Sequence, residues 1–214
     1  MGKLIAGTFV SLDGVMQAPG APDEDRSGGF DHGGWVFGYW DDEMGQVIDR
    51  QVARADALLL GRKTYEIFAA HWPRISDEDP MAAMLNRVAK YVATDTLDRL
   101  EWGPSTLVRR AQLKDEVARL KSRPDSEIHV MGSGDLLQTL IREDLVDFYV
   151  LWVFPVVLGG GKRLFGTGAI PAGFRLTGSR AFSSGVVVLE YERHGAIKRG
   201  SFALDQEGVA AGTT

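Results

Sequence analysis

Apolar residues along this chain follow two alternating patterns: short continuous runs, and stretches in which they recur at helical spacing. The continuous runs predict buried strands at residues 4–10, 57–60, 91–94, 105–108 and 127–131. The helical stretches predict helices that begin near Asp41, Arg62, Asp79, Gln112 and Asp135. Strands that alternate with helices favour a largely parallel sheet with helices on both faces.

The C-terminal part departs from this alternation. A long apolar run at 146–165 precedes two strand-like segments, 174–182 and 185–193, which predict an antiparallel hairpin. We therefore expect one three-layer α/β domain over residues 1–194. Residues 195–214 lack apolar periodicity, so we expect a flexible tail there.

Composition and charge narrow the range of functions. The chain has 214 residues and a net charge of −5, so it lacks the basic surface on which nucleic-acid binding depends. It has no cysteine, and its four histidines show no metal-ligand spacing, so we expect no metal site. The N-terminal apolar run is too short for a signal peptide or a membrane span, so we expect a cytoplasmic protein without a membrane partner.

Two turns have the features of an anion site. Ligands of open α/β sheets bind beyond the carboxyl ends of the strands, where helix N-termini present free N–H groups. The turn at 60–64 offers two cations, and the turn at 131–134 offers small residues around Ser133. Asp135 follows in the first helical turn and competes with an anion for the helix dipole. Each turn alone is also compatible with an ordinary connection between a strand and a helix. Together the two turns predict an anion site that is split between them.

A long glycine- and proline-rich loop covers residues 17–40. Loops of this length inside a compact domain are usually functional or mobile. Its aromatic residues, with the pair Trp35 and Trp40, suit a lid that closes on something flat, and they equally suit anchors that hold a surface loop in place.

Five segments, in order, resemble the dihydrofolate reductase-like superfamily, most closely the branch that contains the reductase domain of riboflavin biosynthesis. They are "SLDGV", "ADALLLGRKTYEIFAAHWP", "YVATDTL", "IHVMGSGDLLQTLI" and "DFYVLWVFPVVLGGGKRLF". The resemblance implies a dihydrofolate reductase-like α/β fold with a mixed, mostly parallel sheet and a C-terminal antiparallel hairpin.

The resemblance also implies an NADPH-dependent oxidoreductase. Hydride would pass to a C=N group of a pteridine- or pyrimidine-like substrate, as in a 5-amino-6-(5-phosphoribosylamino)uracil reductase. It implies cofactor contacts at Gly7, Val15, Gly61, Arg62, Lys63, Thr64, Thr94, Gly132, Ser133, Gly134, Asp135 and Leu136. The cations Arg62 and Lys63 favour NADPH over NADH, because they suit the 2′-phosphate.

The proton donor is less well marked in the sequence. Reduction of C=N needs a proton as well as a hydride, and the resemblance makes Asp42 and Glu43, beside Asp41, the candidate acids. The alternative is that these acids only complement the dipole of the helix they begin. Leu137 replaces a tyrosine of the folate reductases, which disfavours folate as substrate. A non-catalytic NADP(H)-binding or interaction protein is therefore the second hypothesis, and the family resemblance also implies a homodimer.

Overall fold

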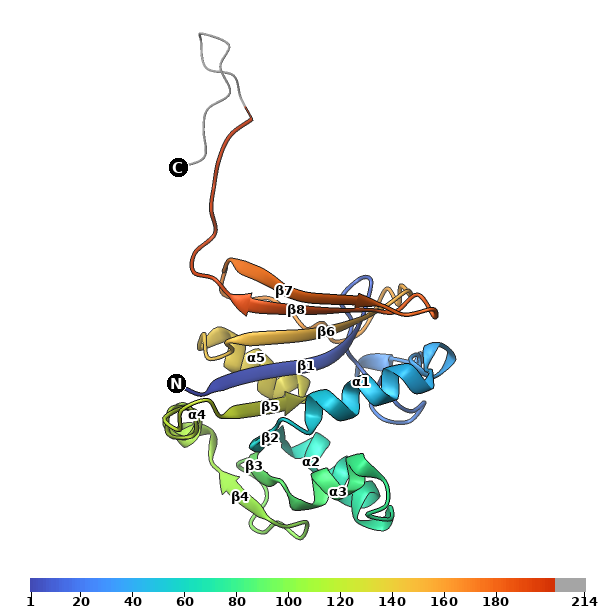
Figure 1. Ribbon diagram of the computed structural model, residues 1–214, viewed down its shortest axis with the longest axis vertical. Helices are drawn as coiled ribbons and strands as arrows, with labels where there is room; N and C mark the ends of the chain where they lie inside the picture. The colour runs from blue at the N-terminus through green and yellow to red at the C-terminus, as the bar shows by residue number, and fades with distance from the viewer. Residues whose placement is uncertain (203–214) are drawn as a thin grey trace.

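The computed structural model describes residues 1–202, and these form one eight-stranded sheet flanked by helices (Figure 1). The strands are β1 (Lys3–Ser11), β2 (Ala57–Gly61), β3 (Ala89–Ala93), β4 (Ser105–Val108), β5 (Glu127–Met131), β6 (Phe148–Phe154), β7 (Phe174–Ala181) and β8 (Val187–Arg193). The α-helices are α1 (Asp42–Val52), α2 (Arg62–His71), α3 (Pro80–Arg87), α4 (Leu113–Lys121) and α5 (Gly134–Arg142). Short 3-10 turns occur at Ser27–Gly29, Phe37–Tyr39, Trp72–Arg74 and Arg110–Gln112.

The strand order is β4-β3-β2-β5-β1-β6-β8-β7. All pairs from β4 to β6 are parallel, whereas β8 runs antiparallel to both β6 and β7. Figure 1 shows the hairpin at the top of the sheet and β4 at the bottom. The predicted fold class, a mostly parallel sheet closed by a C-terminal hairpin, is confirmed.

The two faces of the sheet are buried by different helices. Leu4 and Ala6 of β1, with Val130 of β5, pack in a core cluster that includes the apolar faces of α4 and α5. The opposite face packs against α1, α2 and α3, for example through Leu58 and Leu60 of β2. Strands covered on both sides read as continuous apolar runs, which is why their positions were visible in the sequence.

Two predicted helix starts are confirmed by their caps. The Asp41 carboxylate accepts a hydrogen bond from the Met44 amide at 2.8 Å, and Asp79 does the same for Ala82 at 2.9 Å. Such caps satisfy amides that have no partner inside the helix. The long apolar run at 146–165 contributes only β6 to the sheet, because Pro155 has no N–H to continue the strand.

The single domain expected over residues 1–194 stays a prediction, supported by the one continuous sheet. Residues 195–202 of the expected tail form no helix or strand, and residues 203–214 lie outside the described part of the chain. No helix among residues 1–202 combines the length and apolar character needed to cross a bilayer.

Asp13 fastens the loop after β1 to the loop after β6, at the rim of the sheet. Its carboxylate accepts hydrogen bonds from the Ser11 hydroxyl at 2.6 Å and from the amides of Leu158 and Gly159 at 3.1 and 3.0 Å. The hydrogen bond from Ser11 is the largest of the effects that lower the Asp13 pKa to about 2. The ionised carboxylate therefore stabilises this connection between the two loops.

We expect Asp13→Asn to lower the melting temperature at neutral pH. The folded-state pKa is below the usual value of 3.8, so the stabilisation is present above about pH 4 and is lost as the pH falls towards 2. Thermal unfolding measured across this pH range should show the gap between wild type and variant closing. Asp98→Asn, at a carboxylate that is 98% exposed, is the control; a gap of the same size at every pH would contradict the assignment.

Candidate functional site

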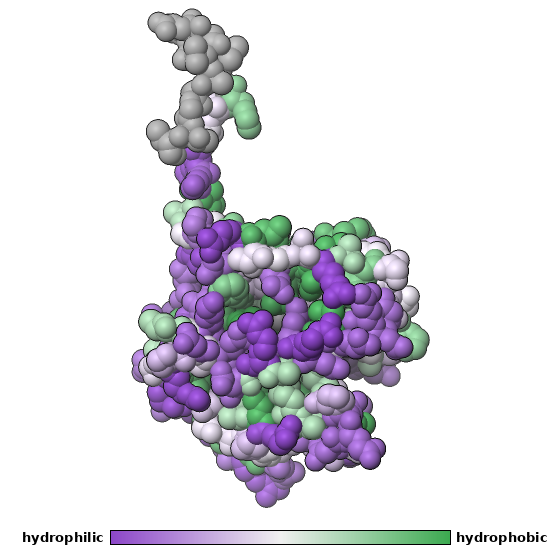
Figure 2. All heavy atoms as spheres, viewed as in Figure 1, coloured by the Kyte–Doolittle hydropathy of each residue, from purple (hydrophilic) through white to green (hydrophobic). Residues whose placement is uncertain are grey.

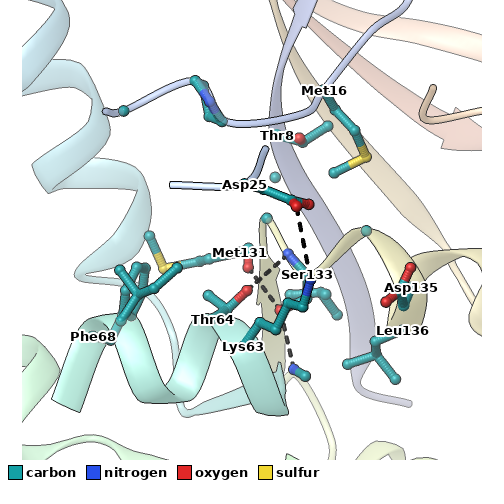
Figure 3. Close-up of a pocket in the computed structure, with 18 of the residues that line it drawn as sticks. Thr8, Met16, Asp25, Lys63, Thr64, Phe68, Met131, Ser133, Asp135 and Leu136 are labelled. Carbon is teal, nitrogen blue, oxygen red and sulfur yellow. Dashed lines mark hydrogen bonds and ion pairs between the residues drawn. The ribbon is translucent and has the colours of Figure 1, made fainter. Parts of the chain in front are cut away.

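A pocket of about 1050 Å³ opens at the carboxyl ends of the parallel strands. Its walls come from strands β1, β2, β3, β5 and β6, from helices α1, α2 and α5, and from the loop that follows β1. Figure 3 shows the part formed by β1, this loop, α2 and the start of α5. The volume is in the range that holds a large cofactor or ligand. Among the predicted cofactor residues, every one except Val15 lines this pocket.

The two predicted anion turns lie side by side in the pocket. Pairing of β2 with β5 brings them together, and Ser133 links them. The Ser133 hydroxyl accepts a hydrogen bond from the Gly61 amide at 3.0 Å, while the Ser133 amide donates to the Thr64 hydroxyl at 3.2 Å (Figure 3). Gly132 and Ser133 both have positive φ, 56° and 54°, so the turn reverses tightly enough to make these contacts.

The helices that begin at this pocket have no side-chain caps. Gly61 precedes α2 and Ser133 precedes α5, and neither provides a capping hydrogen bond. By contrast, α1 and α3 begin outside the anion turns and are capped by aspartates. The first amides of α5 after Ser133 therefore point a positive dipole end and free N–H groups at the pocket.

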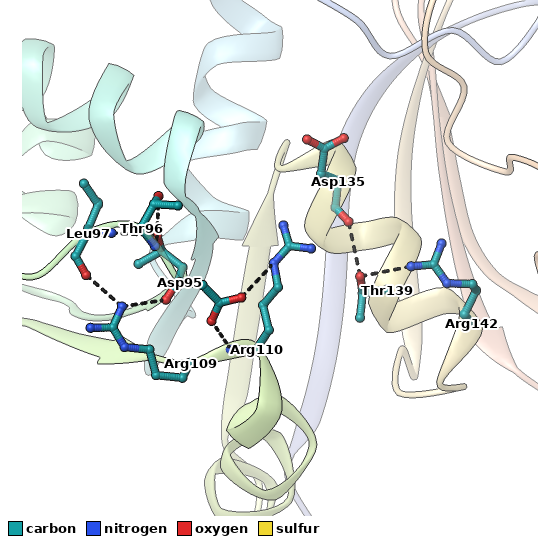
Figure 4. Close-up of polar contacts among 9 residues, drawn as sticks. Asp95, Thr96, Leu97, Arg109, Arg110, Asp135, Thr139 and Arg142 are labelled. Carbon is teal, nitrogen blue, oxygen red and sulfur yellow. Dashed lines mark hydrogen bonds and ion pairs between the residues drawn. The ribbon is translucent and has the colours of Figure 1, made fainter.

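Besides Lys162, which is paired with Asp25 at 2.8 Å, three cations border the pocket: Arg62, Lys63 and Arg110. Each has one carboxylate partner at a long distance: Glu66 at 3.9 Å for Arg62, Asp25 at 3.7 Å for Lys63 and Asp95 at 3.7 Å for Arg110. Figure 4 shows the Arg110 guanidinium between Asp95 and the start of α5. Such loose, solvent-exposed pairs contribute little energy, so these cations can turn towards an incoming anion. Sequence analysis missed Arg110, because it follows β4 without a recognisable motif.

The loop after β1 is fastened across the pocket by Gln17 and Asp25. The Gln17 amide nitrogen donates to the carbonyl oxygens of Asp25 and Ser27, both at 2.9 Å. The Asp25 carboxylate accepts from Lys162 at 2.8 Å and lies 3.7 Å from Lys63. Partial burial opposes ionisation of Asp25, but the hydrogen bonds from Lys162 and Ser27 outweigh it and hold its pKa well below the usual range. An anionic side chain thus already contacts one of the pocket's cations.

The tryptophan pair anchors the loop and does not face the pocket. The Trp35 ring packs edge-on against Phe154, and its indole N–H donates to the Gln17 carbonyl at 2.8 Å. The Trp40 ring packs against Phe9. Of the two interpretations of these aromatics, the structure favours anchoring, and residues 17–21 and 23–25 supply the part of the loop that lines the pocket.

Around the expected nicotinamide position, Gly7 lines the pocket but Val15 does not. Val15 is fully buried and packs with Ala18 and Phe30. Its neighbour Met16 reaches the pocket and would touch a side chain placed at Gly134. At the other end, the Thr94 hydroxyl accepts from the amides of Thr96 and Leu97 at 3.2 and 3.3 Å, so it shapes its own turn beside the pocket.

The acids expected to donate a proton, Asp42 and Glu43, lie outside the pocket. Both side chains are exposed, and Glu43 pairs with Arg180 of β7. The reason is helical phase: Met44 and Val47 are buried against the sheet, which turns the two acids outward. The structure therefore gives them no contact with the pocket, and their placement fits the alternative of helix-start acids.

One end of the pocket, between α1 and the sheet, is lined mostly by apolar side chains. They are Ile5, Phe9, Ile48, Val150 and Trp152, and we name this part the apolar compartment. Two polar side chains border it, Gln51 and His129. The His129 ring lies 3.2 Å from the Glu127 carboxylate, and burial lowers the His129 pKa despite that contact.

Gln51 was detectable in the sequence. It recurs at helical spacing with Met44, Val47 and Ile48, so it is a polar residue on an otherwise apolar face. Among residues 1–202, no group of three histidine, aspartate or glutamate side chains is arranged to hold a metal ion.

Comparisons with known proteins agree with this architecture. The sequence model described as the RibD C-terminal domain matches residues 2–188. The uncharacterized protein YyaP of Bacillus subtilis is 29% identical over 196 residues, which are 90% of this chain and 96% of YyaP. The structure of a putative riboflavin biosynthesis protein from Shewanella sp. PV-4 has a TM-score of 0.66 at 25% identity, covering 90% of this chain and 99% of that one.

The fold extends further, to a dihydrofolate reductase from Enterococcus faecalis solved in complex with NADP(H). Its TM-score is 0.58 at 13% identity, over 89% of this chain and 96% of that one. At this level of identity the likeness concerns the fold alone, and it confirms the dihydrofolate reductase-like architecture. The family model, by contrast, matches residues 2–188, which include nearly the whole sheet. This match shows that the chain belongs to the RibD C-terminal domain family.

Proposed function

We propose that this protein is an NADPH-dependent reductase that transfers a hydride to a C=N group of a pteridine- or pyrimidine-like substrate. The observation that carries the proposal is the pairing of two uncapped helix N-termini, with three cations beside them, in one pocket with an apolar compartment. Membership of the RibD C-terminal domain family supports a reductase of the riboflavin-pathway type. A 5-amino-6-(5-phosphoribosylamino)uracil-like compound is therefore the first substrate to test.

The residues present fit NADPH. The free amides of α5 suit a pyrophosphate, and the guanidinium of Arg62 with the amine of Lys63 suits the extra 2′-phosphate. Gly7 and Met16 would border the nicotinamide, and the apolar compartment would hold a flat substrate ring against it. The bound cofactor would supply the hydride, while the protein orients both rings and excludes water.

A second candidate function is NADP(H) binding without turnover. The exposed position of Asp42 and Glu43 favours it, because neither acid lines the pocket. In this case the anion turns would bind the dinucleotide while the chain lacks a side chain that delivers the proton. The two functions share the cofactor and differ in chemistry.

NADPH titration, followed by quenching of tryptophan fluorescence, tests both candidates. We expect saturable binding in the micromolar range, because the pocket combines charge, amides and apolar surface. Loss of NADPH absorbance on addition of 5-amino-6-(5-phosphoribosylamino)uracil, with dihydrofolate as the comparison, then distinguishes a reductase from a binder. Absence of NADPH binding would rule out both functions.

The double variant Arg62→Ala, Lys63→Ala should weaken NADPH binding roughly ten- to a hundredfold and NADH binding much less, since only NADPH carries the 2′-phosphate. The comparison of the two dissociation constants is the measurement. Arg99→Ala, at an arginine that is 86% exposed and does not line the pocket, is the control. Equal losses for the two nucleotides would contradict the 2′-phosphate assignment.

We also propose a homodimer formed at the β7 edge of the sheet. β7 pairs with β8 on one side only within the described chain, and its side chains are nearly all exposed. Leu176 of β7 and Phe165 are about half exposed, and Figure 2 shows apolar surface at this end of the molecule. An exposed edge strand with apolar neighbours favours pairing with a second copy.

Sedimentation equilibrium should give twice the mass of the chain. Leu176→Lys should shift the measured mass towards that of the monomer.

A further inference from the structure

Gln51 is placed to contact a ligand in the apolar compartment. It lies on the face of α1 that Ile48 and Val52 share, it is half-buried, and it lines the pocket. Its partner Glu190 lies opposite Val150 of β6 in the sheet, and Val150 in turn lies beside Gly7 of β1. A primary amide in such surroundings is costly unless its hydrogen-bonding groups have partners.

Glu190 of β8 fixes the orientation of this amide. The Gln51 nitrogen donates a hydrogen bond to the Glu190 carboxylate at 3.3 Å. A carboxylate only accepts, so the amide nitrogen must face it, which leaves the amide oxygen and the second N–H for another partner. Gly178 of β7 leaves room for the Glu190 carboxylate, since a side chain there would approach it to 3.0 Å. Within residues 1–202, Glu190 forms no ion pair that would draw it away from Gln51.

Two other polar side chains on this side of the pocket, His129 and Thr8, already have partners. The His129 ring contacts the Glu127 carboxylate at 3.2 Å, and the Thr8 hydroxyl donates to the Phe9 carbonyl at 3.3 Å. The acids at the start of α1 face outward, as described above. Gln51 therefore offers one free acceptor and one free donor, side by side, at the wall of an apolar compartment.

We propose that Gln51 binds the edge of a neutral, flat heterocycle at which a ring N–H lies next to a C=O. The amide oxygen accepts from the ring N–H, and the amide N–H donates to the carbonyl, so the two groups form a pair of parallel hydrogen bonds. An amide has no negative charge to balance the positive charge of a protonated ring, as a carboxylate would. Gln51 therefore selects for neutral uracil-type and other lactam rings. The inference rests on the proposed function in assigning this compartment to the substrate.

The test uses three flat probes that differ by one methyl group. Lumazine, a pteridine with two lactam groups, is compared with its 1-methyl and 3-methyl derivatives, each of which blocks one ring N–H. Binding is followed by probe fluorescence, with and without NADPH. We expect one of the two methylated probes to bind wild-type protein about tenfold more weakly than lumazine. This factor corresponds to the loss of one or two buried hydrogen bonds.

Gln51→Leu should abolish this preference, so that the variant binds all three probes within a factor of about two, whereas NADPH affinity is unchanged. Gln46→Leu, an exposed glutamine on the same helix, should behave as wild type. Glu190→Gln should reduce the preference as well, because either orientation of Gln51 then finds a partner; this variant decides the matter if Gln51→Leu does not fold.

The proposal is overturned if wild-type protein binds the three probes equally or binds none of them, or if the preference survives in Gln51→Leu. Failure of NADPH to bind would instead overturn the proposed function. That result is distinguishable, because the probe preference is measured without the nucleotide as well.

Discussion

Parallel pairing of β2 with β5 aligns Ala57 with Ile128 and Leu58 with His129, so that both strands end at the same edge of the sheet. The two turns that follow are then close enough for Ser133 to join them through hydrogen bonds to Gly61 and Thr64. Without this alignment the cations of one turn and the amides of the other would serve different surfaces. The pocket, its charge and the direction of both helix dipoles follow from it.

The strands and helices were predictable because their signals are local. Buried strands covered on two faces appear as apolar runs in the sequence. The helices that begin after Asp41 and Asp79 are marked by these capping residues. The two anion turns were also predictable, since a cationic or glycine-rich turn after a strand is visible in a few residues. Their meeting across some seventy positions was predicted from the rule that ligands bind beyond the carboxyl ends of the strands, and the hydrogen bonds of Ser133 confirm it.

The direction of side chains was less accessible to the sequence. Asp42 and Glu43 are near the pocket in the chain but face away from it, because the burial of Met44 fixes the rotation of α1. Arg110 reaches the pocket from the turn after β4, the edge strand of the sheet. No neighbouring residue in the sequence identifies it as part of an anion site. The orientation of the Gln51 amide could not be predicted, because its partner Glu190 becomes its neighbour only when the hairpin folds back onto β6.

The loose contact between Asp25 and Lys63 has a consequence for small ions in solution. Any anion that reaches Lys63 competes with the Asp25 carboxylate, which lies 3.7 Å away. A chloride ion brings the same single charge as Asp25 and loses its freedom of translation on binding, so it is a weak competitor. A phosphate ester brings more charge and several acceptor oxygens. The loop thus favours polyvalent anions over chloride at this lysine.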